Sequence, residues 1–150
     1  MFHFEKLKPE EVAWLAGLFQ AEAQFYIDHR KRSKVADPNY VPPPPVPAVK
    51  IEMVEKDLME RVAEWLGQKV AVQNRKTTAG NTVYRVNLTA RQKVKVFLET
   101  ILPYVYGEKK RGEIQELLDI CDEYDNWLAA GGRSQAARHA ARMKAQRDKE

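Results

Sequence analysis

Between Pro9 and Arg30 a helical pattern passes directly into a strand pattern. From Val12 to Ala23, apolar residues recur at spacings of three and four, as on one face of a helix. From Gln24 onward, polar and apolar residues alternate, as in a strand with one polar face. The chain must therefore place the end of a helix and the start of a strand at one corner.

The rest of the chain continues with short elements of both kinds. Alternation predicts strands at 49–54, 69–75 and 82–88, the last two joined by a loop at 77–81. Helical spacing predicts helices at 56–66, 90–101 and 112–128, and a final basic helix at 134–149. Helix, strand, strand, helix, strand, strand and helices in this order predict an α+β domain. We expect a four-stranded, mostly antiparallel sheet with helices on its apolar face.

The opposite face of this sheet carries many hydrogen-bond donors. Inward positions are Val70, Val72, Tyr84, Val86 and Leu88 on the later strands. Outward positions on all strands are Gln24, Tyr26, Asp28, Arg30, Lys50, Lys69, Gln73, Arg75, Arg85 and Asn87. A solvated outer face gives such a pattern, and so does a surface that contacts bases and phosphates.

The net charge of +4 is concentrated at the C-terminus. Residues 131–150 hold six basic and two acidic residues, so the other 130 residues are neutral overall. We expect one domain at 1–130 and a basic helix or tail at 131–150, which could contact phosphates or remain disordered. Residues 31–47 combine a basic run with prolines and predict a stiff, extended surface loop, for which a simple spacer is an equal interpretation.

Composition excludes several classes of protein. The single cysteine, Cys121, excludes an intramolecular disulfide and a cysteine-based zinc cluster, and fits a reducing compartment. No apolar run approaches the roughly 20 residues of a membrane span. We therefore expect an intracellular protein of the cytoplasm or an organelle matrix, without a membrane partner.

One segment indicates a family. Leu15-Ala16-Gly17-Leu18-Phe19-Gln20-Ala21-Glu22-Ala23, followed by Gln24-Phe25, resembles the LAGLIDADG motif of homing endonucleases. Trp14 before it, Met53 to Asp57 before the second helix, and Leu102 to Gly107 before a lysine pair extend the resemblance over most of residues 10–120. It implies the αββαββα fold, with the four strands forming a saddle over DNA.

The resemblance implies the activity and the assembly. Members of this family hydrolyse phosphodiester bonds of both DNA strands at a specific site, in intron homing, and use no small-molecule substrate. Ala16 and Gly17 remove bulk from a helix face, so two such helices can approach closely. Because the chain has one motif, we expect a homodimer through the Leu15–Ala23 helix and a palindromic or pseudo-palindromic target. The expected interface residues are Leu15, Ala16, Gly17, Phe19 and Gln20.

The resemblance also assigns site residues. Glu22 takes the place of the metal-binding acid, with the Ala21 carbonyl as a second ligand, for Mg²⁺ with Mn²⁺ as a substitute. Glu52 would position water, and Lys109 or Lys110 would supply a cation near the scissile phosphate. Lys31, Arg32, Lys34 and Lys76 join the outward residues named above as expected DNA contacts.

Three departures from the motif and three alternatives accompany this interpretation. Gln20 replaces a frequent acid at a position that caps or packs, and Ala21 and Ala23 replace glycines. One alternative is an intron RNA maturase on the same fold, and another is a catalytically inactive DNA-binding regulator. The third is an unrelated α+β interaction protein. None of the three histidines, His3, His29 and His139, has metal-ligand spacing with another.

Overall fold

The structure is a computed structural model that describes residues 4–29 and 41–149. Its helices are α1 (Pro9–Glu22), α2 (Lys56–Leu66), α3 (Arg91–Ile101), α4 (Glu108–Ala129) and α5 (Gly132–Lys149). Its strands are β1 (Ala23–Asp28), β2 (Val46–Met53), β3 (Ala71–Lys76) and β4 (Thr82–Leu88). Two short 3-10 helices complete it, η1 (Phe4–Lys6) and η2 (Leu102–Tyr104).

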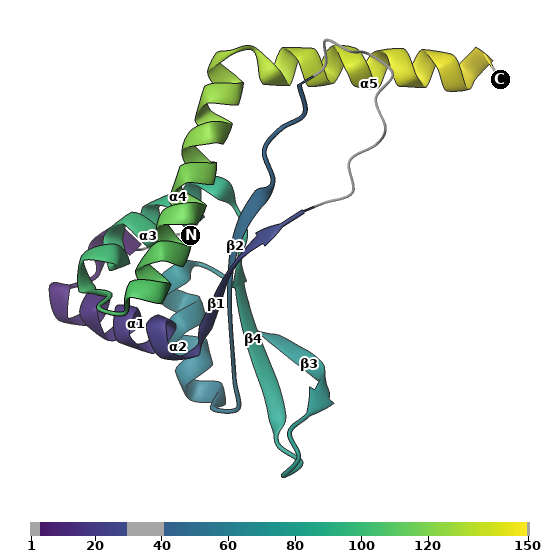
Figure 1. Cartoon of the computed structure of the whole chain (residues 1–150). Coiled ribbons are helices and arrows are strands. Elements are labelled where there is room, and N and C mark those ends of the chain that lie inside the picture. Colours follow the sequence, from purple (N-terminus) through teal and green to yellow (C-terminus); the bar gives the residue numbers. More distant parts are fainter. Residues whose placement is uncertain (1–3, 30–40, 150) are drawn as a thin grey trace.

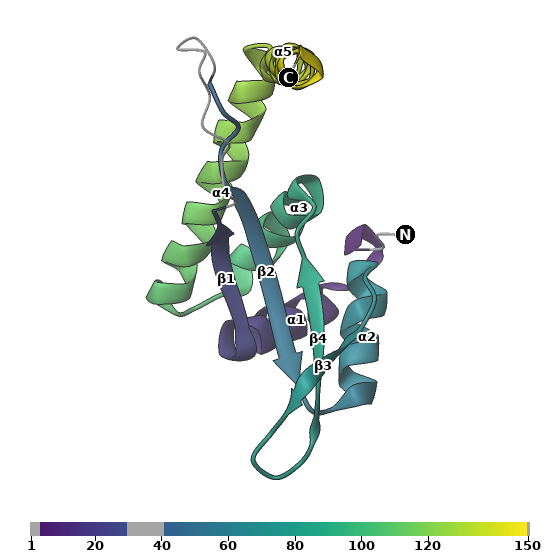
Figure 2. The ribbon, with the colours of Figure 1, turned by 90° about the vertical axis from the view of Figure 1, so that its right-hand side faces the viewer.

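The four strands form one antiparallel sheet in the order β1-β2-β4-β3. Helices α1 to α4 lie on one side of it, and the other side is open (Figures 1 and 2). The predicted fold class, an α+β domain with helices on one sheet face, is confirmed.

The core lies between the sheet and the helices. Phe97 of α3 contacts Phe4 and Phe19 edge-on, with ring centroids 5.2 and 4.9 Å apart, and all three rings are buried. On the sheet side, Ile51 and Leu88 complete the packing. Burial of apolar side chains like these is the main stabilising term for a domain of this size.

The predicted helix at 56–66 is found with the same bounds. It ends because Gly67 adopts a positive φ of 64°, which glycine reaches at little steric cost.

Cys121 is buried in the structure, and this burial raises the pKa of its thiol to about 11. Among the described residues, no helix has the length and apolar character needed to cross a bilayer.

Three sequence predictions need correction. Strand β2 begins at Val46 and includes Pro47, which lies beyond the part of β2 that pairs with β4. Helix α4 begins at Glu108 rather than at 112. Val72 was expected to point inward but is 64% exposed, because β3 is an edge strand that pairs only with β4 and extends away from the helices (Figure 1).

Helix α4 continues beyond the other helices and turns sharply into α5 (Figure 1). At the turn, Gly131 has a φ of 83°, and Gly132 lies directly against the indole ring of Trp127. That ring stacks on Tyr124 with centroids 5.6 Å apart, and its Nε1–H donates to the Val41 carbonyl at 2.8 Å. The α4–α5 corner is thus a packed joint.

Gly132→Ala is expected to open this corner. A Cβ at position 132 would overlap the Trp127 ring, which its stacking and hydrogen bond hold in place. We expect a loss of about 1–3 kcal/mol in the free energy of unfolding, measured by urea denaturation. Gly112→Ala is the matched control, because a Cβ there meets no atom within 4 Å and alanine favours a helix by about 0.5–1 kcal/mol. Equal stability of the two variants would contradict the packed corner.

Candidate nucleic-acid interface

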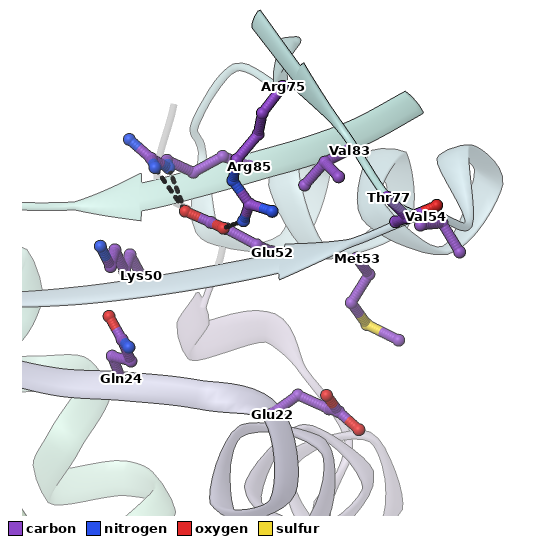
Figure 3. Close-up of a pocket in the computed structure, with 10 residues that line it drawn as sticks. All are labelled: Glu22, Gln24, Lys50, Glu52, Met53, Val54, Arg75, Thr77, Val83 and Arg85. Atoms are coloured by element: carbon purple, nitrogen blue, oxygen red, sulfur yellow. Dashed lines mark hydrogen bonds and ion pairs between the residues drawn. The ribbon is translucent and has the colours of Figure 1, made fainter. Parts of the chain in front are cut away.

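The predicted corner between helix and strand lies at Glu22 and Ala23. Helix α1 begins at Pro9, where the Lys8 amide donates to the Glu11 carboxylate at 2.9 Å. It ends at Glu22, because Ala23 already has extended backbone angles and starts β1. The Glu22 side chain is exposed at this corner, beside the open face of the sheet (Figure 3).

The strand register sets the polar side chains in rows. Gln24 of β1 lies opposite Lys50 of β2, which lies opposite Asn87 of β4. In the next row, Glu52 lies opposite Arg85. The Lys50 ammonium also lies 5.5 Å from the centre of the Tyr26 ring. The structure therefore brings these predicted contact residues together on one face.

A depression of about 510 Å³ lies where this face meets the Glu22 corner (Figure 3). Most of its lining was predicted as site residues: Glu22, Gln24, Lys50, Glu52, Arg75 and Arg85. Thr77, from the loop at 77–81 that was expected to extend the DNA contacts, also lines it, and so do Met53, Val54 and Val83, which the sequence did not assign to the site. Val83 lies two residues before Arg85 in β4 and so shares the polar face with it, yet it is only 4% exposed. Valine is common in strands, so the sequence alone does not indicate that Val83 lines a polar depression.

Glu52 holds two arginines across the depression. Its carboxylate accepts a hydrogen bond of 2.7 Å from Arg85 Nε, and it forms ion pairs with Arg85 and Arg75 (Figure 3). Partial burial raises the pKa of the Glu52 carboxyl, but the hydrogen bonds and charges of Arg85 and Arg75 outweigh this and hold the pKa below its usual value. Glu52 therefore stays ionised and is a weak base.

The two lysines that the sequence could not distinguish lie in the first turn of α4. Lys110 Nζ donates to the Ala23 carbonyl at 3.3 Å, lies 3.4 Å from a Glu113 oxygen, and lies 5.6 Å from the centre of the Phe25 ring. Lys109 is exposed. Of the two, Lys110 is the one in contact with the α1–β1 corner.

Gln20 links the same corner to α4. Its Oε1 accepts hydrogen bonds from the backbone amides of Tyr106 at 2.8 Å and Gly107 at 2.9 Å. Gly107 is the residue before α4, so this side chain satisfies amides that precede the helix. Position 20 thus caps the start of α4, one of the two roles expected for it.

Of the five expected dimer-interface residues, Gln20 is half-buried and its side chain is bonded within its own chain, and the other four divide into two groups. Leu15, Ala16 and Phe19 are at most 1% exposed within the single chain, so assigning them to an intermolecular interface was wrong. They belong to the core because α1 uses its apolar stripe to cover the sheet. Gly17 is exposed, and a Cβ there would meet no atom within 4 Å. Trp14, on the same helix, is 42% exposed.

The remaining predicted contacts lie along the strands. Asp28 ends β1, Lys69 precedes β3, and Gln73 and Lys76 lie on β3. Arg30, Lys31, Arg32 and Lys34 lie outside the described residues. Within residues 4–29 and 41–149, no group of three or more His, Cys, Asp or Glu side chains is close enough to hold a metal ion.

Comparison with known proteins identifies the fold. No protein-family model matches the sequence, and no curated protein is significantly similar to it. Among solved structures, the homing endonuclease I-CvuI in complex with the I-CreI target is 20% identical, with a TM-score of 0.55 over 79% of this chain and 69% of that chain. The homing endonuclease I-TnaI is 18% identical, with a TM-score of 0.53 over 77% and 71%.

A third structure shows the same fold within a longer chain. The LAGLIDADG homing endonuclease I-SmaMI bound to cleaved DNA is 16% identical, with a TM-score of 0.59, and the match covers 83% of this chain but 40% of that one. The chain therefore has the fold of the LAGLIDADG homing endonucleases, as its motif predicted.

Replacing Glu52 tests the ion-pair network. Because the folded-state pKa of Glu52 is lowered, its contribution to stability is fully present above its ordinary pKa of 4.5 and is lost as the pH falls through the folded value. We expect Glu52→Gln to lower the free energy of unfolding by about 1 kcal/mol at pH 7, and the difference to shrink below pH 4.5.

Glu60→Gln is the matched control for this measurement. The Glu60 carboxylate lies 3.9 Å from Lys56 Nζ and both side chains are more than half exposed, so a change of under about 0.5 kcal/mol is expected. Urea denaturation of the three proteins between pH 3 and pH 7 measures the effect. A Glu52→Gln difference that stays constant with pH would contradict the network.

Proposed function

We propose that the chain is a homodimeric, site-specific DNA endonuclease that hydrolyses phosphodiester bonds of both strands. The observation that carries this is the position of Glu22. Its exposed carboxylate lies at the end of α1, at the edge of a sheet face that presents amide, ammonium and guanidinium donors. Donors of these kinds contact the bases and phosphates of DNA. A carboxylate at the edge of the face can hold a metal ion that promotes phosphodiester hydrolysis.

Target recognition is assigned to the open face of the sheet. Amide groups of Gln24 and Asn87 flank Lys50 in one row, and Arg75 and Arg85 stand in the depression. Amide side chains pair with adenine edges in the major groove, and arginine pairs with guanine. A two-stranded β-ribbon fits that groove.

The dimer is assigned to the exposed side of α1. Gly17 leaves the backbone open to close approach, and α1 ends at Glu22. Two copies that meet along this side would bring two Glu22 carboxylates near one axis. The second copy completes this site, because Glu22 is the one acid that we assign to the metal in each chain.

A divalent metal fits this arrangement. Mg²⁺ is usually held by one or two carboxylates together with substrate phosphates and water, and Glu22 from each copy with the Ala21 carbonyl would supply the protein ligands. Mn²⁺ takes similar oxygen ligands and is expected to substitute. When bound, the metal lowers the pKa of water and stabilises charge on the phosphate.

The remaining residues position charge. Lys110, held at the Ala23 carbonyl, is the proposed cation near the scissile phosphate, and Lys109 is the neighbouring exposed cation. Glu52 orients Arg75 and Arg85 toward the duplex rather than acting as a base. Water attacks phosphorus and the 3′ oxygen leaves, which yields 5′-phosphate and 3′-hydroxyl ends.

Glu22→Gln tests the catalytic role. The amide keeps the shape of the side chain but loses the charge, so cleavage should fall by about three orders of magnitude while binding remains. Selection from randomised duplexes with Mg²⁺, followed by sequencing of cut ends, identifies the target. Cleavage rate and affinity are then measured for wild type and variant on that duplex.

The same assay separates the alternatives. Equal inactivity of wild type and Glu22→Gln, with tight site-specific binding, would indicate a DNA-binding regulator instead. Selective binding to a folded intron RNA without DNA cleavage would indicate a maturase. A monomer in solution would favour an unrelated interaction protein.

Gly17→Leu tests the dimer. A Cβ at this exposed position meets no atom within 4 Å, so the fold should persist, but two α1 helices could no longer meet closely. We expect a shift from dimer to monomer in analytical ultracentrifugation, with an unchanged circular dichroism spectrum. Gly112→Leu adds the same side chain at another open helical glycine and should leave the dimer intact. Dimers that resist Gly17→Leu would place the interface elsewhere.

A further inference from the structure

Helix α5 projects toward the open face of the sheet. In Figure 1 it runs from the end of α4 across the top of the molecule, toward the side to which the polar face is turned. Figure 2 looks onto that face and shows α5 end-on, with the C-terminus toward the viewer. At 1.5 Å per residue, its 18 residues extend about 27 Å. The helix thus borders the open face at the end where β1 finishes and β2 begins.

The helix is strongly basic over its whole length. It contains Arg133, Arg138, Arg142, Lys144, Arg147 and Lys149 and one acidic residue, Asp148. Arg138, Arg142 and Lys149 recur at spacings of four and seven, which places them along one side of the helix. Five of its residues are alanine and only Met143 is a large apolar residue, so packing against a core does not explain the sequence.

The start of α5 is fixed to the domain. Gln135 Nε2 and Trp127 Nε1 both donate to the Val41 carbonyl, at 2.9 and 2.8 Å. The segment before β2 is held in turn by Arg91, which donates to the carbonyls of Pro44 at 2.6 Å and Pro45 at 3.0 Å. A helix so fixed at its base directs its charges to a defined place.

We infer that α5 binds the phosphate backbone of duplex DNA beyond the segment covered by the sheet. The inference rests on the proposed function, since it places the duplex along the open face, and it adds a second contact region outside that face. The charge of α5 complements phosphate, and its alanines let the backbone of the helix approach the duplex closely. This contact would be independent of base sequence, because it involves phosphates alone.

The test is the affinity of the full-length protein for a random-sequence duplex of about 30 base pairs at several salt concentrations. Arg138→Gln/Lys149→Gln removes two charges from α5, and glutamine keeps the helix because its helix propensity is close to that of lysine and arginine. We expect about a tenfold decrease in affinity. The slope of log affinity against log salt should fall by about 0.9 for each phosphate that a chain no longer neutralises.

Lys6→Gln/Lys8→Gln is the matched control. These lysines lie at and just after η1, whose Phe4 packs against α3 on the side away from the open face. The control removes the same charge and should keep wild-type affinity and salt slope. Circular dichroism of all three proteins checks that α5 remains helical.

Equal decreases in affinity for the α5 and control variants, or no decrease in either, would overturn the inference. Tighter α5-dependent binding to duplex RNA than to DNA would overturn it as well. Cleavage of the selected target serves as the separate test of the proposed function. If cleavage fails while the α5 variant alone binds more weakly, α5 binds DNA but the protein is no nuclease. If cleavage succeeds without an effect of α5, only the inference fails.

Discussion

The hydrogen bonds from the Tyr106 and Gly107 amides to Gln20 fix the α1–β1 corner, on which the proposed site depends, against α4. They join the last turn of α1 to the start of α4, and Lys110 adds a bond to the Ala23 carbonyl from the other direction. Glu22 and β1 therefore have a fixed position relative to α4. Because α4 also carries the joint to α5, one helix relates the proposed catalytic corner to the basic helix about 27 Å long.

Glu52 reduces the repulsion between the cations of the open face. Three cations, Lys50, Arg75 and Arg85, line one depression and would repel each other in the absence of DNA. The Glu52 carboxylate lies between the two arginines and fixes their planar groups. Bidentate recognition of a base needs a preorganised guanidinium group, so in the proposed DNA complex the acid would support specificity even though it lowers the attraction for phosphate.

Local patterns in the sequence predicted most of the fold. Helix α2 was predicted to the residue, because apolar spacing and the terminating Gly67 agree. The start of α4 was missed because Gly112 suggested a boundary, whereas the actual helix start depends on Gln20, which precedes Gly107 by 87 residues. Such a contact leaves no local signal.

The site was predicted less completely than the fold, for the same reason. An apolar stripe on α1 does not reveal whether it covers its own sheet or a second copy, and Leu15, Ala16 and Phe19 cover the sheet. The pairing of Glu52 with Arg75 and Arg85 joins positions 23 and 33 residues apart and follows from strand register. Alternation predicted which side chains share a face but not which of them pair.

The sequence separates a neutral domain from a basic C-terminal segment, and the fold places the two in different parts of the molecule. Residues 1–130 are neutral overall, so long-range attraction to DNA cannot come from the domain as a whole. In the proposed DNA complex, a neutral domain with donors fixed by Glu52 would discriminate between bases, because a wrong base would leave those donors unpaired. Attraction that does not depend on the base sequence would then lie outside the open face of the sheet. There it would raise the affinity for any duplex without weakening the discrimination between bases. The excess positive charge of the chain lies in residues 131–150, most of which form α5.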